Sequence, residues 1–343
     1  MGTIGAEYEI VVRSTDGEVV ERFGGESDSF LTNFTKLIEA GVKSVNVSVV
    51  DLGGTARSCG NFSCATKDDP GGVTTRGVLV GNGAGTVAAS NRSLANQIQN
   101  SVLSYQPALG APEIPYVSDG MIKCRIIKRS FANVSGAPVL ITETGIAALA
   151  SGYNILVLRD LLSESVNVPV GGAVDVAYTF KSPVSGGFTL NYFKALACSF
   201  YGGAAIPVID TGGISRSIDF VGTFPTNALA GQGHFGIQVG TDTAPSTGSE
   251  YTLGSPVAHG SDNGQLQYGE MRYNATAVSG SNIEFSCYRS FINLSENPIT
   301  IREVGLVARH SGYNILLMRN TIDPIEIPPY DGVNVTITHR TVI

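Results

Sequence analysis

The chain has 343 residues, only 15% of them charged, and a formal net charge of −7. Nucleic-acid binding requires clustered Lys and Arg side chains, and no basic segment exists here, so we expect no nucleic acid as a partner. With 42 Gly and no Trp, the composition excludes a helical bundle or a disordered tail. It favours a turn-rich protein with a weakly charged surface.

The first 25 residues predict a hairpin. Apolar residues in Glu7–Arg13 and Val19–Arg22 flank Asp16-Gly17, a turn dipeptide. We expect this hairpin to be an arm outside the main fold that pairs with a neighbouring chain's sheet edge. The start lacks a basic segment followed by an apolar core, so no signal peptide is expected. No apolar run is long enough to span a bilayer, so no membrane partner is expected.

Two short segments have helical periodicity. In Ser29–Ala40 the apolar residues Phe30, Phe34, Leu37 and Ile38 fall on one face, and Gly41 is expected to end the helix. Phe188–Phe200 carries a similar apolar face. We therefore expect one short helix at the start of each half of the chain.

Short strands with Gly and Pro between them dominate the rest of the sequence. Met121–Asn133 and Val139–Ile146 predict a hairpin about the turn at 135–138, and Tyr153–Arg159 predicts a further strand. Val166–Val168 and 174–180 predict another hairpin, and 325–327 with 333–339 repeats its pattern. Many short alternating strands are typical of an antiparallel β-sandwich.

The second half of the sequence repeats the first at a spacing of about 160 residues. A period this long is too large for a solenoid unit, so each copy should be a whole domain. The matches include Ser151–Leu156 with Ser311–Leu316, Arg129-Ser-Phe131 with Arg289-Ser-Phe291, Glu143-Thr-Gly145 with Glu303-Val-Gly305, Gly77–Gly81 with Gly236–Gly240, and Asp51–Gly54 with Asp210–Gly213.

These patterns predict a mainly all-β protein. We expect an N-terminal hairpin over residues 1–25, followed by two tandem homologous antiparallel β-sandwich domains at 26–182 and 183–343. Each sandwich is expected to open with one short helix.

The polar residues that recur in both copies are candidates for a shared site. A duplicated binding site could require them, or each sandwich could use them as structural ion pairs or turn anchors. We favour the structural interpretation and expect Glu to pair with Arg, because a buried charge needs a partner. The residues are Arg129, Glu143 and Arg159, with Arg289, Glu303 and Arg319 in the second copy.

Other sequence patterns resemble sites but lack required parts. Asp210-Thr-Gly-Gly213 resembles an aspartic protease triplet, but its only counterpart is Asp51-Leu-Gly, so a turn is the better interpretation. Gly81–Gly85 has no following Lys-Ser/Thr for phosphate binding, and His259-Gly-Ser-Asp262 places triad residue types side by side, which rarely gives triad geometry. We therefore expect no catalytic residues and no cofactor. We also expect no metal, because the His and Cys residues lack the spacing of metal ligands.

The five cysteines show no equivalent pair in the two copies. A disulfide framework essential to the fold would be present in each copy. Cys59 and Cys64 are therefore interpreted as free thiols, with a local disulfide as the alternative.

Several of these segments resemble a class of tailed-bacteriophage virion proteins, once in each copy. They are Asp16-Gly17, Ser29–Phe34, Asp51–Arg57, Ile301–Leu306 and Tyr313–Arg319. In that class an aromatic-x-Asn-Phe segment, a Thr-Gly-Gly turn, a Val-Gly-Thr strand and a Glu-Val-Gly-Leu strand follow one another in that order. These are structural motifs, so the resemblance implies no active site. The first copy departs from the pattern at Leu52 and Thr144.

The resemblance implies a non-enzymatic structural protein of the virion, made in the cytoplasm of the bacterial host. It could lie in the tail, neck or fibre base, or decorate the capsid. Expected partners are other copies, as a trimer or hexamer, and other virion proteins, with loops around Asn82 and Asp242 as candidate contacts. The alternatives are a carbohydrate-binding or adhesin module and a glycan-cleaving enzyme, which needs two nearby carboxylates.

Overall fold

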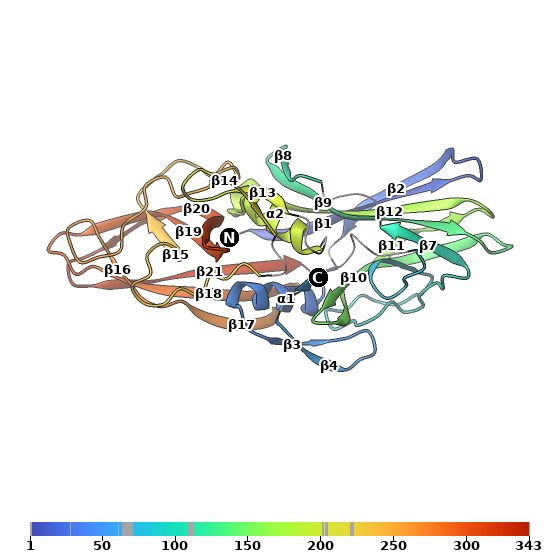
Figure 1. Ribbon diagram of the computed structural model, residues 1–343, viewed down its shortest axis with the longest axis horizontal. Helices are drawn as coiled ribbons and strands as arrows, with labels where there is room; N and C mark the ends of the chain where they lie inside the picture. The colour runs from blue at the N-terminus through green and yellow to red at the C-terminus, as the bar shows by residue number, and fades with distance from the viewer. Residues whose placement is uncertain are drawn as a thin grey trace.

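A computed structural model describes residues 2–27, 29–60, 62–63, 71–108, 113–200, 202, 205–219 and 223–342. The molecule is elongated and built mainly from β-strands in several sheets, and both chain ends lie near its middle (Figure 1). It is all-β in class, as the sequence predicts. Below, the first half is the described chain up to residue 182, and the second half is the remainder.

One ten-stranded sheet runs through both halves of the molecule. Its main path is β16-β18-β21-β1-β12-β9-β7, with β17 beside β18, β2 beside β1 and β8 beside β9. The bounds are β1 Thr3–Arg13, β2 Val19–Ser27, β7 Leu103–Ala108, β8 Tyr116–Ser118, β9 Met121–Asn133, β12 Ala173–Pro183, β16 Gln267–Tyr268, β17 Arg272–Ser279, β18 Asn282–Ile292 and β21 Gly332–Val342.

Each half also contains a smaller sheet, and the remaining strands form two separate two-stranded hairpins. The first half has β11-β10-β5 with β6 beside β10, and the second has β15-β19-β20. The hairpins pair β3 with β4 and β13 with β14. The bounds are β3 Val47–Val50, β4 Ala56–Cys59, β5 Phe62–Ser63, β6 Gly77–Gly81, β10 Val139–Ala150, β11 Tyr153–Val168, β13 Ile206–Ile209, β14 Ser215–Ile218, β15 Gly236–Gly240, β19 Ile299–His310 and β20 Tyr313–Ile327.

The strand registers of the two halves correspond closely. The β10–β11 ladder is irregular between Ile141 and Glu143, and again after Ile146. The β19–β20 ladder is irregular at the matching places, between Ile301 and Glu303 and after Leu306. Since β-bulges fix where a strand bends, the two halves bend at equivalent points.

The most closely repeated sequence forms a tight turn. Ser151 and Gly152 join β10 to β11 with positive φ angles of 48° and 86°, and Ser311 and Gly312 do the same between β19 and β20 at 50° and 84°. Two successive positive φ angles define the turn whose twist matches antiparallel strands. This backbone requirement gives a physical reason for the repeated Ser-Gly.

Three predicted hairpins are arches between sheets. β9 pairs with β12, β7 and β8, whereas β10 pairs with β11, β6 and β5. The strands on either side of the turn at 135–138 therefore lie in different sheets, and the same holds for β11 and β12, and for β20 and β21. The alternating pattern marked the strands correctly but carried no information about which strands pair.

A buried asparagine holds each arch. The side chain of Asn133 donates to the carbonyls of Val168 and Pro169, both at 3.0 Å, and its Oδ1 accepts the backbone N–H of Ser135. Asn293 makes the equivalent bonds to Ile327 and Ser295. Both asparagines lie in Asn-x-Ser triplets, and their buried side-chain amides serve the arch.

The two helices pack across the boundary between the halves. Helix α1 (Thr32–Lys43) contacts β11 of its own half and β17 and β18 of the other. Helix α2 (Leu190–Phe200) contacts β20 of its own half and β9 of the other. They lie in the middle of the molecule (Figure 1), so each helix completes the core of both halves.

Helix α1 runs past Gly41, which was expected to end it. It ends at Lys43, where Ser44 takes a left-handed conformation. The carbonyls of Gly41 and Val42 accept the N–H groups of Phe224 and Thr226 from the second half. The end of the helix is therefore satisfied by the opposite half of the chain.

The N-terminal hairpin is an integral part of the sheet, contrary to the expected free arm. β1 pairs with β12 from Gly5 to Arg13, and with β21 through Thr3 and Ile4. It also pairs with β2, as the hairpin prediction requires. β1 thus connects the two halves, which also share one sheet and each pack against the helix of the other half. Deleting residues 1–25 would remove an inner strand.

A buried hydroxyl pair between the halves gives a test of this coupling. Thr35 Oγ1 of α1 lies 2.8 Å from Thr341 Oγ1 of β21. We expect Thr35→Val to lower the free energy of unfolding by about 1 kcal/mol, because Thr341 loses a buried partner. A Thr35→Val/Thr341→Val variant should lose less than the sum of the two single losses. Urea unfolding of the four proteins measures this, and strict additivity would contradict the contact.

Candidate functional site

The recurring glutamates form buried ion pairs with the recurring arginines. Arg159 Nε donates to Glu143 Oε2 at 2.9 Å, and Arg319 Nε donates to Glu303 Oε2 at 2.9 Å. Both glutamates are fully buried, and both arginines are almost so. In each half the pair joins the middle of one strand to its hairpin partner, β10 to β11 or β19 to β20.

Each glutamate also holds a neighbouring loop through backbone N–H groups. Glu143 accepts the N–H groups of Gly83, Ala95 and Asn96 at 3.1, 3.0 and 2.8 Å. Glu303 accepts those of Gly254 and Ser255 at 3.1 and 2.8 Å. The carboxylates are therefore saturated by internal donors, as expected of structural anchors.

The electrostatics of Glu143 show which effect dominates. Burial alone would raise its pKa, but the N–H groups of Asn96 and Ala95 and the Arg159 guanidinium outweigh burial and lower the pKa. A carboxyl with a lowered pKa stays ionised and makes a poor general acid. Glu143 is therefore unsuited to the role of the carboxyl that donates a proton in glycan cleavage.

Glycines beside the glutamates make these contacts possible. A Cβ on Gly81 would lie 2.6 Å from Glu143 Oε1, and one on Gly240 would lie 2.3 Å from Glu303 Oε1. A Cβ on Gly83 would also meet Glu143. The glycine-rich segment starting at Gly81, considered above as a phosphate loop, instead provides space for a buried carboxylate.

The other recurring arginines anchor loops through carbonyl groups. Arg289 donates to the carbonyls of Gly269, Phe235, Ile237, Leu229 and Gln232, and burial lowers its pKa to about 10. Arg129 donates to the carbonyls of Gln106 and Arg76. The guanidinium of Arg289 lies 4.8 Å from the ring of Tyr268, and that of Arg129 lies 5.0 Å from the ring of Tyr105.

The Asp-x-Gly-Gly segments form turns in which the aspartate holds an arginine. Asp210 accepts the N–H groups of Gly212 and Ile214, both at 2.9 Å, and Nε of Arg216 at 2.7 Å. Asp51 accepts the N–H of Thr55 and Nε of Arg57. These hydrogen bonds, with the arginine bond the largest contribution, lower the pKa of both aspartates.

Each arginine of this pair also stacks on the tyrosine of the repeated Ser-Gly-Tyr segment. Arg57 lies 4.2 Å from the ring of Tyr153, and Arg216 lies 4.2 Å from the ring of Tyr313. The hairpins that carry the two aspartates, β3–β4 and β13–β14, are on opposite sides of the molecule (Figure 1). The two carboxylates therefore cannot share a proton in the way an aspartic protease requires.

Replacing Asp210 tests this turn. We expect Asp210→Ala to lower the free energy of unfolding by about 1 kcal/mol, because two backbone N–H groups lose their acceptor. Asp210→Asn keeps the accepting oxygen and should lose less. Thermal or urea unfolding measures both variants, and equal losses would show that the N–H bonds contribute nothing.

The triad-like segment is not assembled as a catalytic site. His259 Nδ1 accepts the backbone N–H of Tyr268 at 3.1 Å, which fixes that ring nitrogen as an acceptor. Asp262 lies in a turn where its carbonyl accepts the N–H of Gln265. Within the described residues no group of three or more His, Cys, Asp or Glu side chains is placed to bind a metal ion.

The two candidate contact loops have different roles. Asn82 is exposed, and its Oδ1 accepts the side-chain N–H of Asn96 at 2.6 Å. Asp242 belongs to the second buried ion-pair network, because Arg319 donates to its Oδ2 at 2.8 Å. Asn82 is thus the more exposed of the two side chains, whereas Asp242 is half-buried and held by an arginine.

The cysteines that the structure describes are buried. Cys59, Cys124 and Cys287 are free thiols, and Cys198 is buried as well. Burial raises the pKa of Cys124 and of Cys287 to about 12. Cys64 lies outside the described residues. Buried thiols with raised pKa values are poor nucleophiles.

Comparisons with protein-family models, with curated proteins and with solved structures each find no match to this chain. Neither described helix has the length and apolar character needed to cross a lipid bilayer.

Proposed function

We propose that this protein is a non-enzymatic structural component of a bacteriophage virion, in the tail, neck or fibre base or on the capsid surface. It would act through assembly with copies of itself and with other virion proteins. The proposal also takes the two corresponding halves to be an internal tandem duplication.

One observation carries the proposal. The six recurring charged side chains, Arg129, Glu143 and Arg159 with their second-half counterparts, are all engaged in holding strands and loops together. Selection for a catalytic site would keep carboxylates accessible with tuned pKa values. Selection for a rigid assembly unit would keep buried anchors of this kind, which specify one arrangement of the loops.

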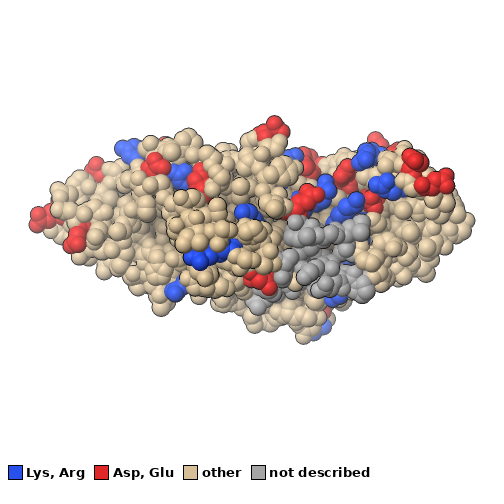
Figure 2. Space-filling model, turned by 45° about the horizontal axis from the view of Figure 1, so that its top comes forward, with Lys and Arg blue, Asp and Glu red and all other residues tan. Residues whose placement is uncertain are grey.

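The duplication supports the same proposal. A chain with two similar halves lets a trimer present six related surfaces, which suits a partner with six-fold symmetry. Charged side chains are scattered over the visible face and are densest toward the end that carries β2, with uncharged surface between them (Figure 2). A weakly charged surface can be buried against neighbours at low desolvation cost.

The test is whether the protein belongs to the particle. We expect the purified chain to form a trimer or hexamer by light scattering and to co-purify with intact particles through a density gradient. A strict monomer absent from particles would contradict the proposal. Binding to a glycan array would favour the adhesin alternative, and release of reducing sugar from a polysaccharide would favour the enzyme.

A further inference from the structure

The outer edge of β21 is open along most of its length. β21 pairs with β18 on one side over its whole length, but on the other side only Arg340 and Thr341 pair, with β1. Among the described residues no strand pairs with Val333–His339 on that side. Asn334 and Thr336 in this stretch are exposed.

The equivalent edge in the first half is covered. β12 corresponds to β21, and β1 runs antiparallel along it from Gly5 to Arg13. The side chains of Ala6, Ile10 and Val12 on β1 are buried there, and Tyr8 nearly so. The first half thus shows how such an edge is closed in this fold, by an added strand with alternating apolar residues.

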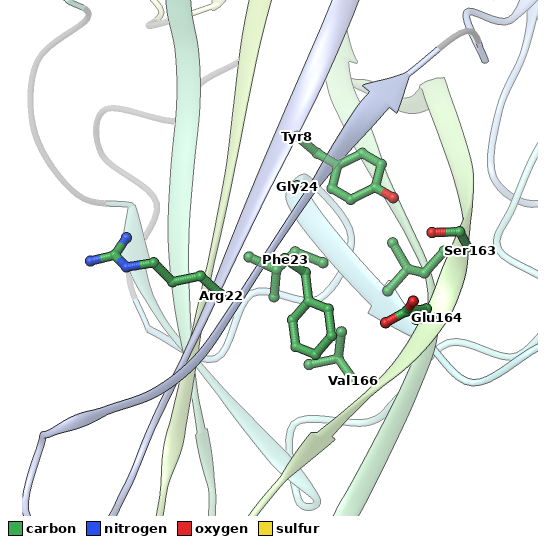
Figure 3. A pocket seen from close by; sticks show the side chains of 9 residues that line it. Tyr8, Arg22, Phe23, Gly24, Ser163, Glu164 and Val166 are labelled. Carbon is green, nitrogen blue, oxygen red and sulfur yellow. The ribbon is translucent and has the colours of Figure 1, made fainter.

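The cavity beside the covered edge is smaller than the cavity beside the open edge. In the first half a small cavity of about 240 Å³ lies between the β1–β2 hairpin and β11. Figure 3 shows the rings of Tyr8 and Phe23 directed toward Ser163, Glu164 and Val166 of β11, while Arg22 extends away. The hairpin therefore fills most of the space at this side of the sandwich.

In the second half the corresponding space is an open cavity of about 640 Å³. It is lined by Asn320–Asp323 of β20, which includes the apolar Ile322, and by Asn334–Thr336 of β21. No hairpin occupies it in the described part of the chain. Ile325 is 38% exposed at its margin, so apolar surface is available there.

The open edge also lacks the usual protection against pairing. Edge strands commonly carry Lys, Pro or bulges that prevent other strands from adding. Val333–His339 reads Val-Asn-Val-Thr-Ile-Thr-His, with no Lys, Arg, Asp, Glu or Pro. The edge of the first half, β2, carries Glu21, Arg22 and Glu26 instead.

We propose that the edge of β21 accepts an extended segment of a partner protein as an added antiparallel strand. The segment carries apolar side chains at alternate positions, as β1 does at Ala6, Tyr8 and Ile10, and these fill the cavity beside β20. Backbone hydrogen bonds supply affinity, and the cavity supplies specificity. This assigns the docking surface of the proposed assembly function, on which it rests.

A tethered strand tests the proposal in the intact protein. The C-terminal end of β21 lies in the middle of the molecule (Figure 1), where a strand antiparallel to β21 would begin. We would append a flexible linker and a second copy of residues 3–27 after Ile343. Tethering raises the effective concentration of the added hairpin to the millimolar range.

Hydrogen exchange is the readout. In the parent protein we expect fast exchange at alternate amides of Val333–His339, and slow exchange throughout Val174–Phe180 of β12. The tethered hairpin should slow the fast β21 amides at least tenfold. A matched control carries Ile10→Pro in the appended copy only and should give no protection.

Three results would overturn the proposal. They are β21 amides already as slow as those of β12, no protection from the tethered hairpin, or equal protection from the Ile10→Pro copy. Protection of β21 that grows with protein concentration in the parent would assign the edge to a second copy of this chain instead. Because these measurements use the chain alone, their failure is separate from failure of the co-purification test.

Discussion

Replacing Glu303 with Ala is expected to destabilise the protein by about 3–5 kcal/mol, the usual loss when one partner of a buried ion pair is removed. Arg319 would remain buried and would keep Asp242 at 2.8 Å, but it would lose the fully buried carboxylate of Glu303 at 2.9 Å. The N–H groups of Gly254 and Ser255 would lose their acceptor at the same time. The change therefore breaks both a charge pair and a loop anchor.

The measurement is urea unfolding of Glu303→Ala beside the exposed control Glu296→Ala, which should change stability by less than about 0.5 kcal/mol. Glu143→Ala should resemble Glu303→Ala, since its pair with Arg159 has the same geometry. Equal midpoints for Glu303→Ala and the parent protein would contradict the anchor role.

The sign of the acid dependence follows from the lowered pKa of Glu143. A carboxyl with a folded pKa below its ordinary value stabilises the protein fully above the ordinary pKa. That contribution is lost as the pH falls through the folded pKa. Glu143→Gln should therefore flatten the loss of stability at acid pH relative to the parent protein.

The sequence predicted the elements better than their pairing. The strands at Met121–Asn133 and Tyr153–Arg159 and both helices are present, because alternation and helical spacing report which face of a segment is buried. The same patterns carry no information on the partner strand. An arch held by Asn133 and a hairpin about Ser151-Gly152 both look like a turn between two apolar runs.

The sequence also did not predict that each helix packs against the opposite half of the chain. The apolar face of α1 predicts that the helix is buried, but it does not say which half buries it. The decisive contacts are single groups such as the Gly41 carbonyl and the Thr35 hydroxyl, which meet residues about 180 or more positions away. No local pattern encodes contacts of that range.

In the candidate site, too, the sequence identified some residues but not all of their contacts. Recurrence in both halves identified the buried Glu and Arg residues, because a residue needed by the fold is needed twice. The stacking of Arg57 on Tyr153 was missed, although Asp-x5-Arg recurs at Asp210 and Arg216 and pointed to it. The carbonyl partners of Arg289 could not be predicted from the sequence, because every residue has a backbone carbonyl and its identity does not indicate which one accepts.

One corresponding position differs in chemistry and leads to the last prediction. In the first half the rings of Phe30, Phe34 and Phe180 pack together, with centroids 4.7–5.7 Å apart. In the second half the corresponding rings are Phe188, Tyr192 and His339. A titratable pair thus replaces two phenylalanines in an otherwise similar cluster.

His339 is held neutral by its surroundings. Its Nε2 lies 2.8 Å from the hydroxyl of Tyr192, Phe285 stacks on the ring, and Nδ1 has no hydrogen-bond partner among the described residues. Burial lowers the pKa of His339 to about 3. Burial also raises the pKa of Tyr192.

This burial makes the protein sensitive to acid in a defined window. Below about pH 6.5, the ordinary pKa of histidine, the unfolded chain binds a proton at this residue and the folded chain does not. Stability is therefore complete above pH 6.5 and falls as the pH drops toward 3. Between pH 7 and pH 5 the loss from this residue should be about 2 kcal/mol.

A Tyr192→Phe/His339→Phe variant recreates the first-half cluster and should remove that loss. Urea unfolding at pH 7 and pH 5 gives the comparison, because other titrating groups contribute equally to both proteins and cancel. The pH-dependent loss should be smaller in the variant by about 2 kcal/mol. His339→Phe alone should cost about 1–3 kcal/mol at pH 7, since the buried Tyr192 hydroxyl loses its partner. An identical pH dependence in the double variant and the parent protein would show that His339 is protonated equally in the folded and unfolded states.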